Sequence, residues 1–192
     1  MVQLDIALFQ WINGLSDRSR FADGVLSIIM SDYAIPVSIT LIATSLWFAG
    51  PKMVRQANQQ AVWIAVVAIL VANVFVWTVN HFYARPRPFE VLDVNLLFYM
   101  ARDPSFPSNS VAVVFAMATA ISFANRRLGI LAYCLSAFMA FARIYGGAHY
   151  PLDVLGGWLT GYGSAHLAKT TIHFLNTPIL HITRMARRLY IA

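Results

Sequence analysis

The sequence predicts an all-α protein, a polytopic transmembrane bundle of five to six helical spans with an interfacial N-terminal helix. Apolar residues make up 59% of the 192-residue chain and charged residues only 11%, against roughly a quarter charged in an average globular domain. So short a chain cannot hide that apolar surface from water, and lipid is the solvent that fits it. The net charge of +6 forms no basic stripe, so no nucleic-acid partner is expected.

Five apolar runs carry the predicted spans. They cover Tyr33–Ala49, Ala61–Tyr83, Val111–Ala124, Leu128–Ala142 and Val154–Phe174. A span needs about 20 residues, and only the second run is unambiguous by itself. The third and fourth runs become spans only if Ser108–Ser110 and Arg143–Gly146 continue their helices into the interface. The spans belong to one membrane domain, in which residues 31–176 form the helical core and residues 177–192 a basic cytoplasmic tail.

The first 30 residues are predicted to form interfacial helices. Leu4, Leu8, Trp11 and their neighbours repeat at helical spacing with polar residues between them. This pattern favours an amphipathic helix in the outer interface. The alternative is an additional buried span packed through Asp23 and Asp32.

Basic residues between the apolar runs predict the orientation of the chain. They follow the first run, join the third to the fourth and follow the fifth: Lys52, Arg55, Arg126, Arg127, Arg184, Arg187 and Arg188. With five spans these positions share one side of the membrane, which the positive-inside rule makes cytoplasmic. We therefore expect a multi-pass protein of the inner (cytoplasmic) membrane.

The opposite, outer side receives charges that the topology does not explain. They are Arg85, Arg87, Arg102, Arg143, His149 and Asp153. Positive charge on this side runs against the positive-inside bias, and an anionic ligand is the simplest reason for keeping it there. The outer face is therefore the expected side of the functional site.

Three segments at predicted helix ends are expected to hold that anion. They are Asn80–Pro88, Pro107–Ser110 and Arg143–Asp153. Helix N-termini present free N–H groups and the positive end of a dipole, which suits phosphate, and guanidinium groups add planar donors for phosphate oxygens. A histidine four residues before an aspartate can be oriented by it, which leaves the far ring nitrogen free to attack phosphorus.

Arg143, His149 and Asp153 have the spacing of the arginine–five–histidine–three–aspartate motif of the type-2 phosphatidic acid phosphatase superfamily. The chain resembles this family over about residues 33–175. Arg87-Pro88 resembles its first motif, and Pro107-Ser108 resembles the opening of its second. Within the superfamily, the resemblance is closest to the small undecaprenyl-diphosphate phosphatases of the bacitracin-resistance type.

The resemblance implies a membrane lipid phosphatase that works through a phosphohistidine intermediate. His149 would attack phosphorus, Asp153 would hold its ring, and Arg143 would complete the catalytic set. The phosphate-binding residues would be Arg87, Arg143, Ser108, Asn109, Ser110, Arg85 and Asn80. The implied partners are a lipid phosphate or diphosphate substrate and membrane lipids, and no metal or other cofactor is expected.

Two positions depart from the family pattern. The first motif usually begins with a lysine where this chain has Asn80, and Arg85 is the candidate for the missing charge. The second motif usually ends in a histidine that protonates the leaving group, and here that residue is Ser110. Positioned acid catalysis contributes about 10²–10⁴-fold, but a lipid monophosphate with a second pKa of about 6 departs unprotonated from a diphosphate. The sequence therefore favours a diphosphate, such as undecaprenyl diphosphate.

The sequence is also compatible with other functions. A phosphatidylglycerophosphate or phosphatidic acid phosphatase is the main alternative within the enzyme class. A catalytically impaired protein that binds or transports lipid phosphates is the alternative outside it, and Asn80 and Ser110 are the observations in its favour. A vanadate-dependent haloperoxidase fits less well, because those enzymes are soluble.

Some of these residues also have structural alternatives. Ser108 can cap the third predicted helix as well as contact phosphate. His81 is either a substitute acid or an interfacial histidine, and the second role is favoured. Gly157 and Gly161 form a small-residue pair that favours close packing of helices within the chain. The alternative is that the pair mediates dimerisation, which would make the protein a homo-oligomer.

Overall fold

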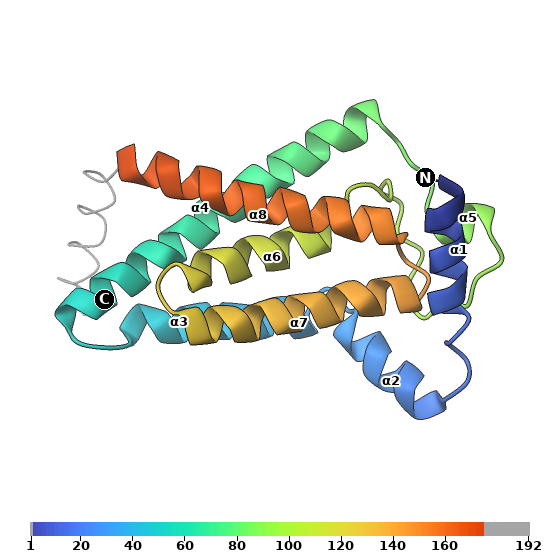
Figure 1. Ribbon diagram of the computed structural model, residues 1–192, viewed down its shortest axis with the longest axis horizontal. Helices are drawn as coiled ribbons and strands as arrows, with labels where there is room; N and C mark the ends of the chain where they lie inside the picture. Colours follow the sequence, from blue (N-terminus) through green and yellow to red (C-terminus); the bar gives the residue numbers. More distant parts are fainter. Residues whose placement is uncertain (1, 175–192) are drawn as a thin grey trace.

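The computed structural model describes residues 2–174, and the regular elements in that range are all helices (Figure 1). They are α1 (Val2–Asn13), α2 (Arg20–Ile29), α3 (Ala34–Phe48), α4 (Lys52–Phe82), α5 (Pro88–Val91), α6 (Asn109–Ser122), α7 (Arg126–Tyr145) and α8 (Pro151–Phe174). The predicted all-α class is confirmed. The predicted cytoplasmic tail, 177–192, lies outside the described residues.

Helix α6 is the centre of the bundle and packs against α4, α7 and α8. Every residue from Val114 to Ile121 is buried. A helix that is apolar on all sides requires such surroundings, and its length of 14 residues suits a buried core helix better than a lipid-exposed span. The shortness of the third apolar run therefore reflects its central position in the bundle.

Among the described residues, two helices are long and apolar enough to cross a membrane, namely α4 and α7. The pair α2–α3, bent by 49°, makes a third candidate if it is one span. Two or three candidate spans are fewer than the five to six predicted, because α6 is short and α8 carries more polar residues. The predicted boundary at residue 30 falls between the two helices of this pair, and it stays a prediction.

Two glycines allow α8 to lie directly on α6. A Cβ atom at Gly161 would come within 2.2 Å of the Ala112 carbonyl oxygen, and one at Gly157 within 2.6 Å of the Ser108 carbonyl oxygen. Since both glycines face backbone of the same chain, the pair serves packing within the bundle.

Gly161→Ala is therefore expected to destabilise the fold. The added methyl group has no room against the α6 backbone, and overpacking of this kind costs about 1–3 kcal/mol. Thermal unfolding of the purified protein in detergent would measure the loss. Gly163→Ala is the matched control, because no atom lies within 4 Å of a Cβ at that position. Equal melting temperatures for the two variants would contradict the close approach.

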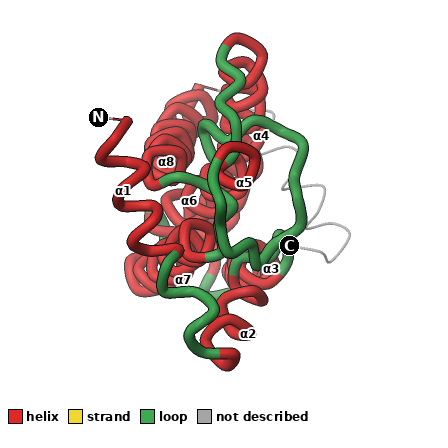
Figure 2. Tube along the Cα trace, turned by 90° about the vertical axis from the view of Figure 1, so that its right-hand side faces the viewer, coloured by secondary structure: helices red, strands yellow, loops and turns green. Residues whose placement is uncertain are grey.

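The polar segments singled out in the sequence meet at one end of the bundle. The ends of α4 and α7 and the starts of α6 and α8 lie at this end, on the right in Figure 1. Figure 2 looks onto it, and α1 lies there beside α7 and α8. The α3–α4 and α6–α7 connections lie at the opposite end, and the basic residues that follow them are in the first turns of α4 and α7.

Candidate active site

His149 lies in the connection between α7 and α8 and is only 2% exposed. Its Nδ1 is 3.0 Å from the Ser105 carbonyl oxygen, which can only accept, so this nitrogen carries the ring proton. Its Nε2 is 3.2 Å from Nη1 of Arg87, which can only donate, so Nε2 presents a lone pair. Burial and the neighbouring Arg87 and Arg143 guanidinium groups lower the pKa of His149 well below its ordinary value. The imidazole is therefore neutral at pH 7.

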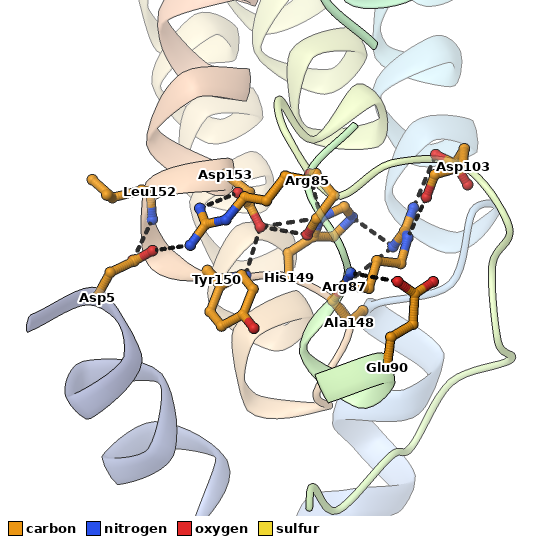
Figure 3. Close-up of polar contacts among 11 residues, drawn as sticks. Asp5, Arg85, Arg87, Glu90, Asp103, Ala148, His149, Tyr150, Leu152 and Asp153 are labelled. Atoms are coloured by element: carbon orange, nitrogen blue, oxygen red, sulfur yellow. Dashed lines mark hydrogen bonds and ion pairs between the residues drawn. The ribbon is translucent and has the colours of Figure 1, made fainter. Parts of the chain in front are cut away.

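Asp153, in the first turn of α8, contacts His149 indirectly (Figure 3). Its Oδ2 is 3.9 Å from Nδ1 of His149, beyond hydrogen-bond distance. Ser105 connects the two residues, because its hydroxyl donates to Oδ2 of Asp153 at 2.5 Å and lies 3.4 Å from Nδ1 of His149. The Tyr150 N–H also donates to Oδ2, at 2.8 Å. The direct contact expected from the spacing is thus replaced by one through Ser105.

Arg87 follows α4 and contacts the histidine ring. Besides its contact with Nε2, Nη1 donates to the Ala148 carbonyl oxygen at 3.1 Å. Its other nitrogens bind Asp103, with Nε donating to the carbonyl oxygen at 2.8 Å and Nη2 to the carboxylate at 2.9 Å. These contacts leave a buried guanidinium directly beside the lone pair of His149.

Arg143 reaches the same region from the last turn of α7. Its Nη2 is paired with the Asp32 carboxylate, and its guanidinium carbon lies 4.4 Å from the centre of the Phe98 ring. Tyr99 donates a second hydrogen bond to Asp32, at 2.9 Å. The Nε of Arg143 is buried and has no hydrogen-bond partner among the described residues. This nitrogen is an unpaired donor of a side chain that lines the same cavity as His149.

A cavity of about 720 Å³ opens in front of these groups. Its polar lining comprises Asp32, Asn73, Asn80, Arg87, Tyr99, Asp103, Asn109, Ser110, Arg143 and His149. Its apolar lining includes Pro36 of α3, Val76 and Trp77 of α4, and Val113 of α6. Six of the predicted catalytic and phosphate-binding residues therefore line one cavity, although they come from three distant segments.

Ser108 lies behind the cavity lining. Its N–H donates to the Asp153 carbonyl oxygen at 3.0 Å, which ties the start of α6 to that of α8. Ser108 occupies the N-cap position of α6, but its side chain makes no capping hydrogen bond. Its buried hydroxyl has no partner in the described part of the chain.

Arg85 does not face the cavity, contrary to its expected phosphate-binding role. Its Nη1 is 2.6 Å from Oδ1 of Asp153, and its Nη2 is 2.6 Å from Oδ2 of Asp5. The guanidinium also lies over the Tyr150 ring. Two carboxylates thus hold its terminal nitrogens, and the positive charge expected to replace the missing lysine at Asn80 is used elsewhere.

Two acidic residues that the motifs did not indicate complete the cavity. Asp32 and Asp103 are partly exposed and hold Arg143 and Arg87, respectively. Carboxylates of this kind occupy guanidinium donors that phosphate oxygens also fit. A phosphate that binds both arginines therefore has to compete with these two carboxylates.

His81 is separate from this group. It is exposed, stacks on Trp77 with 6.0 Å between ring centres, and does not line the cavity. Its position fits an interfacial histidine better than a substitute acid.

Together these features define a helical protein with a buried neutral histidine between two arginines, at a cavity formed where its helices end. Residues 61–176 match the family model of the PAP2 superfamily. The chain belongs to the PAP2 superfamily. With two described helices long and apolar enough to cross a membrane, it is a membrane protein.

One curated relative is the Escherichia coli (strain K12) protein named "Putative undecaprenyl-diphosphatase YbjG". The two are 34% identical over 107 residues, which cover 55% of this chain and 50% of that protein. The chain thus matches about half the length of this relative.

Two solved structures have the same fold. The crystal structure of Aquifex aeolicus LpxE is 27% identical, with a TM-score of 0.69 over 86% of this chain and 94% of the other. The transmembrane PAP2 type phosphatidylglycerolphosphate phosphatase from Bacillus subtilis is 18% identical, with a TM-score of 0.66 over 89% and 85%. At that identity the second match is evidence for the fold alone.

Proposed function

We propose that this protein is a membrane lipid phosphatase in which His149 is the nucleophile. The observation that carries the proposal is the neutral Nε2 of His149, 3.2 Å from the Arg87 guanidinium, beside a cavity that Arg143 also lines. A nucleophile with its lone pair available beside two cationic groups suits attack on an anionic phosphate.

The reaction has two steps. The Nε2 lone pair forms a bond to phosphorus, and the bond from phosphorus to the leaving oxygen breaks with its electron pair on that oxygen. Water then attacks the phosphohistidine, which releases phosphate and restores the neutral ring. Arg87 and Arg143 bind the phosphate oxygens as charge develops, while Asp153 stabilises the positive ring through Ser105.

The proposed substrate is a lipid diphosphate, with undecaprenyl diphosphate as the example suggested by the name of the Escherichia coli relative. Ser110 lines the cavity where the family usually has its acid histidine, and among the described lining residues His149 is the only histidine. Without that acid, a leaving group that departs unprotonated is favoured. A lipid monophosphate is such a group.

The lipid would enter sideways between α3 and α4. These helices contact each other at the opposite end and diverge toward the site (Figure 1), and Pro36, Val76 and Trp77 make the facing lining apolar. An acyl or prenyl chain can therefore stay in lipid while its phosphate lies near His149.

The proposed topology is one multi-pass domain over 1–192 with five spans: the α2–α3 pair, α4, α6, α7 and α8. α1 would lie in the outer interface. Lys52, Arg55, Arg126 and Arg127 at the end opposite the site support a site on the outer face of the cytoplasmic membrane.

One observation favours the alternative of a phosphatidylglycerophosphate-type monoester. Asn73 donates to the Ile69 carbonyl oxygen at 2.8 Å, so its own oxygen accepts from Asn109, at 3.1 Å. The Asn109 oxygen is therefore the atom left over, and it is buried without a partner in the described structure. Such an acceptor suits a head-group hydroxyl better than a phosphate oxygen.

Phosphate release from a long-chain prenyl diphosphate, measured in detergent beside phosphatidylglycerophosphate and phosphatidic acid, tests the substrate class. We expect the diphosphate to react faster by about 10²–10⁴-fold, the usual contribution of the acid that is missing here. Faster release from phosphatidylglycerophosphate would instead support the hydroxyl-binding alternative. Tight binding of all three lipids without release would support the binding or transport protein.

A further inference from the structure

The N-terminal helix contributes one acidic side chain to the region of the active site. Asp5 of α1 is only 4% exposed. Its Oδ2 lies 2.6 Å from Nη2 of Arg85, and its Oδ1 accepts the Leu152 N–H at 2.9 Å, at the start of α8 (Figure 3). A buried carboxylate is costly unless it is paired and hydrogen-bonded, and Asp5 is both.

Arg85 links Asp5 to the carboxylate beside the histidine. Its two terminal nitrogens divide between the two acids, each at 2.6 Å. From Asp153 the contacts continue through the Ser105 hydroxyl to Nδ1 of His149. The series Asp5–Arg85–Asp153–Ser105–His149 thus connects α1 to the proposed nucleophile, and we call it the Asp5 relay.

The charges in the Asp5 relay explain why a second acid is useful. Asp153 has to stabilise the positive charge that develops on the His149 ring, but a guanidinium bound directly to Asp153 offsets that effect. Asp5, Arg85 and Asp153 together carry one net negative charge, whereas Arg85 and Asp153 without Asp5 would carry none. Asp5 also holds the other side of the Arg85 fork, which leaves Arg85 a single contact with Asp153.

We propose that Asp5 is a positioning residue for the phosphatase reaction and that α1 is therefore part of the active site. Through Arg85 it orients Asp153 and preserves the net negative charge beside His149. The role rests on the proposed function of His149. Asp5 itself does not line the cavity, so it acts on the histidine and leaves substrate binding alone.

Asp5→Asn, which keeps the shape of the side chain and removes its charge, tests this role in the full chain. We expect kcat for the lipid diphosphate to fall by about 10–100-fold, the range found for residues that orient metal-binding histidines without touching the metal. KM should stay within about threefold because Asp5 lies outside the cavity. An unchanged kcat, or a loss confined to KM, would overturn the proposal.

Ile12→Ala is the matched control for the docking of α1. Ile12 is a buried apolar residue of the same helix and packs in the cluster around Phe9 and Tyr150. Its truncation loosens α1 without changing a charge, so it should lower the melting temperature and leave kcat within about twofold. If Ile12→Ala lowered kcat as much as Asp5→Asn, docking alone would explain the effect and the proposal would fail.

Arg85→Gln decides whether Asp5 acts through the guanidinium. In that background, Asp5→Asn should lower kcat by less than about twofold further, because the two changes interrupt the same series of contacts. Effects of the two substitutions that multiply would mean that Asp5 acts by another route, such as the Leu152 N–H, and would overturn the proposal.

A readout independent of turnover keeps this inference separate from the proposed function. The His149 ring nitrogens can be followed by NMR in protein labelled at histidine, with the signals assigned by their loss in His149→Ala. Asp5→Asn should shift them and Ile12→Ala should not. If the wild-type chain released no phosphate from any lipid, the proposed function would fail, and these shifts would still decide whether Asp5 acts on His149.

Discussion

His149→Ala is expected to abolish phosphate release from the lipid diphosphate, with a fall in kcat of about 10⁴-fold or more. The substitution removes the only atom proposed to form a bond to phosphorus. The group in contact with Nε2 of His149 is the Arg87 guanidinium, which has no lone pair to offer and cannot take over as nucleophile at neutral pH. Phosphate release under saturating lipid would give the loss directly.

His166→Ala is the matched control, since it removes the same side chain from the far part of α8. His166 contacts the rings of Phe123 and Tyr162 and is exposed, so turnover should be unchanged. Lipid binding by His149→Ala should persist, because both cavity arginines remain. Equal turnover by His149→Ala and the wild type would exclude the proposed nucleophile.

Arg143→Lys is expected to lower kcat by about 10²–10³-fold, the usual loss when one preorganised donor to a developing oxyanion is removed. Lysine keeps the positive charge but loses the planar fork of donors that fits phosphate oxygens. It also loses the buried Nε donor and the stacking on Phe98. Steady-state kinetics with the diphosphate, together with competition by inorganic phosphate, would measure both effects.

Arg102→Lys provides the comparison for Arg143→Lys. Arg102 is exposed, lies in the connection between α5 and α6, and does not line the cavity, so the same exchange there should leave kcat and phosphate inhibition unaltered. An Arg143→Lys variant with wild-type kcat would show that the ion pair with Asp32, and not phosphate binding, is the main use of this arginine.

The all-helical class and the end of the bundle that holds the site could be read from the sequence. Both depend on local information, namely the lengths of the apolar runs and the polar residues where they stop. The number of spans could not be read in the same way. The third run is short because α6 is enclosed by α4, α7 and α8, and the enclosure of a helix is a property of its neighbours.

In the candidate site, too, local sequence predicted some residues and the tertiary structure decided others. Arg143, His149 and Asp153 lie in one short stretch across the turn between α7 and α8, so their spacing alone predicted that they would be close. Ser105 could have been suspected only from its position just ahead of the Pro107-Ser108 motif. Nothing in its local sequence indicated that it would stand between His149 and Asp153.

The partners of the arginines were decided by the tertiary structure. Asp5 and Arg85 are 80 positions apart, and Asp32 and Arg143 are 111 apart. Contacts at such separations depend on how whole helices pack, and sequence spacing carries no information about them. The sequence motifs therefore indicated the histidine and the arginines. The packing of α1 and α2 against α7 and α8 decided which carboxylates hold those arginines. It also decided that Arg85 points toward Asp153 and away from the cavity.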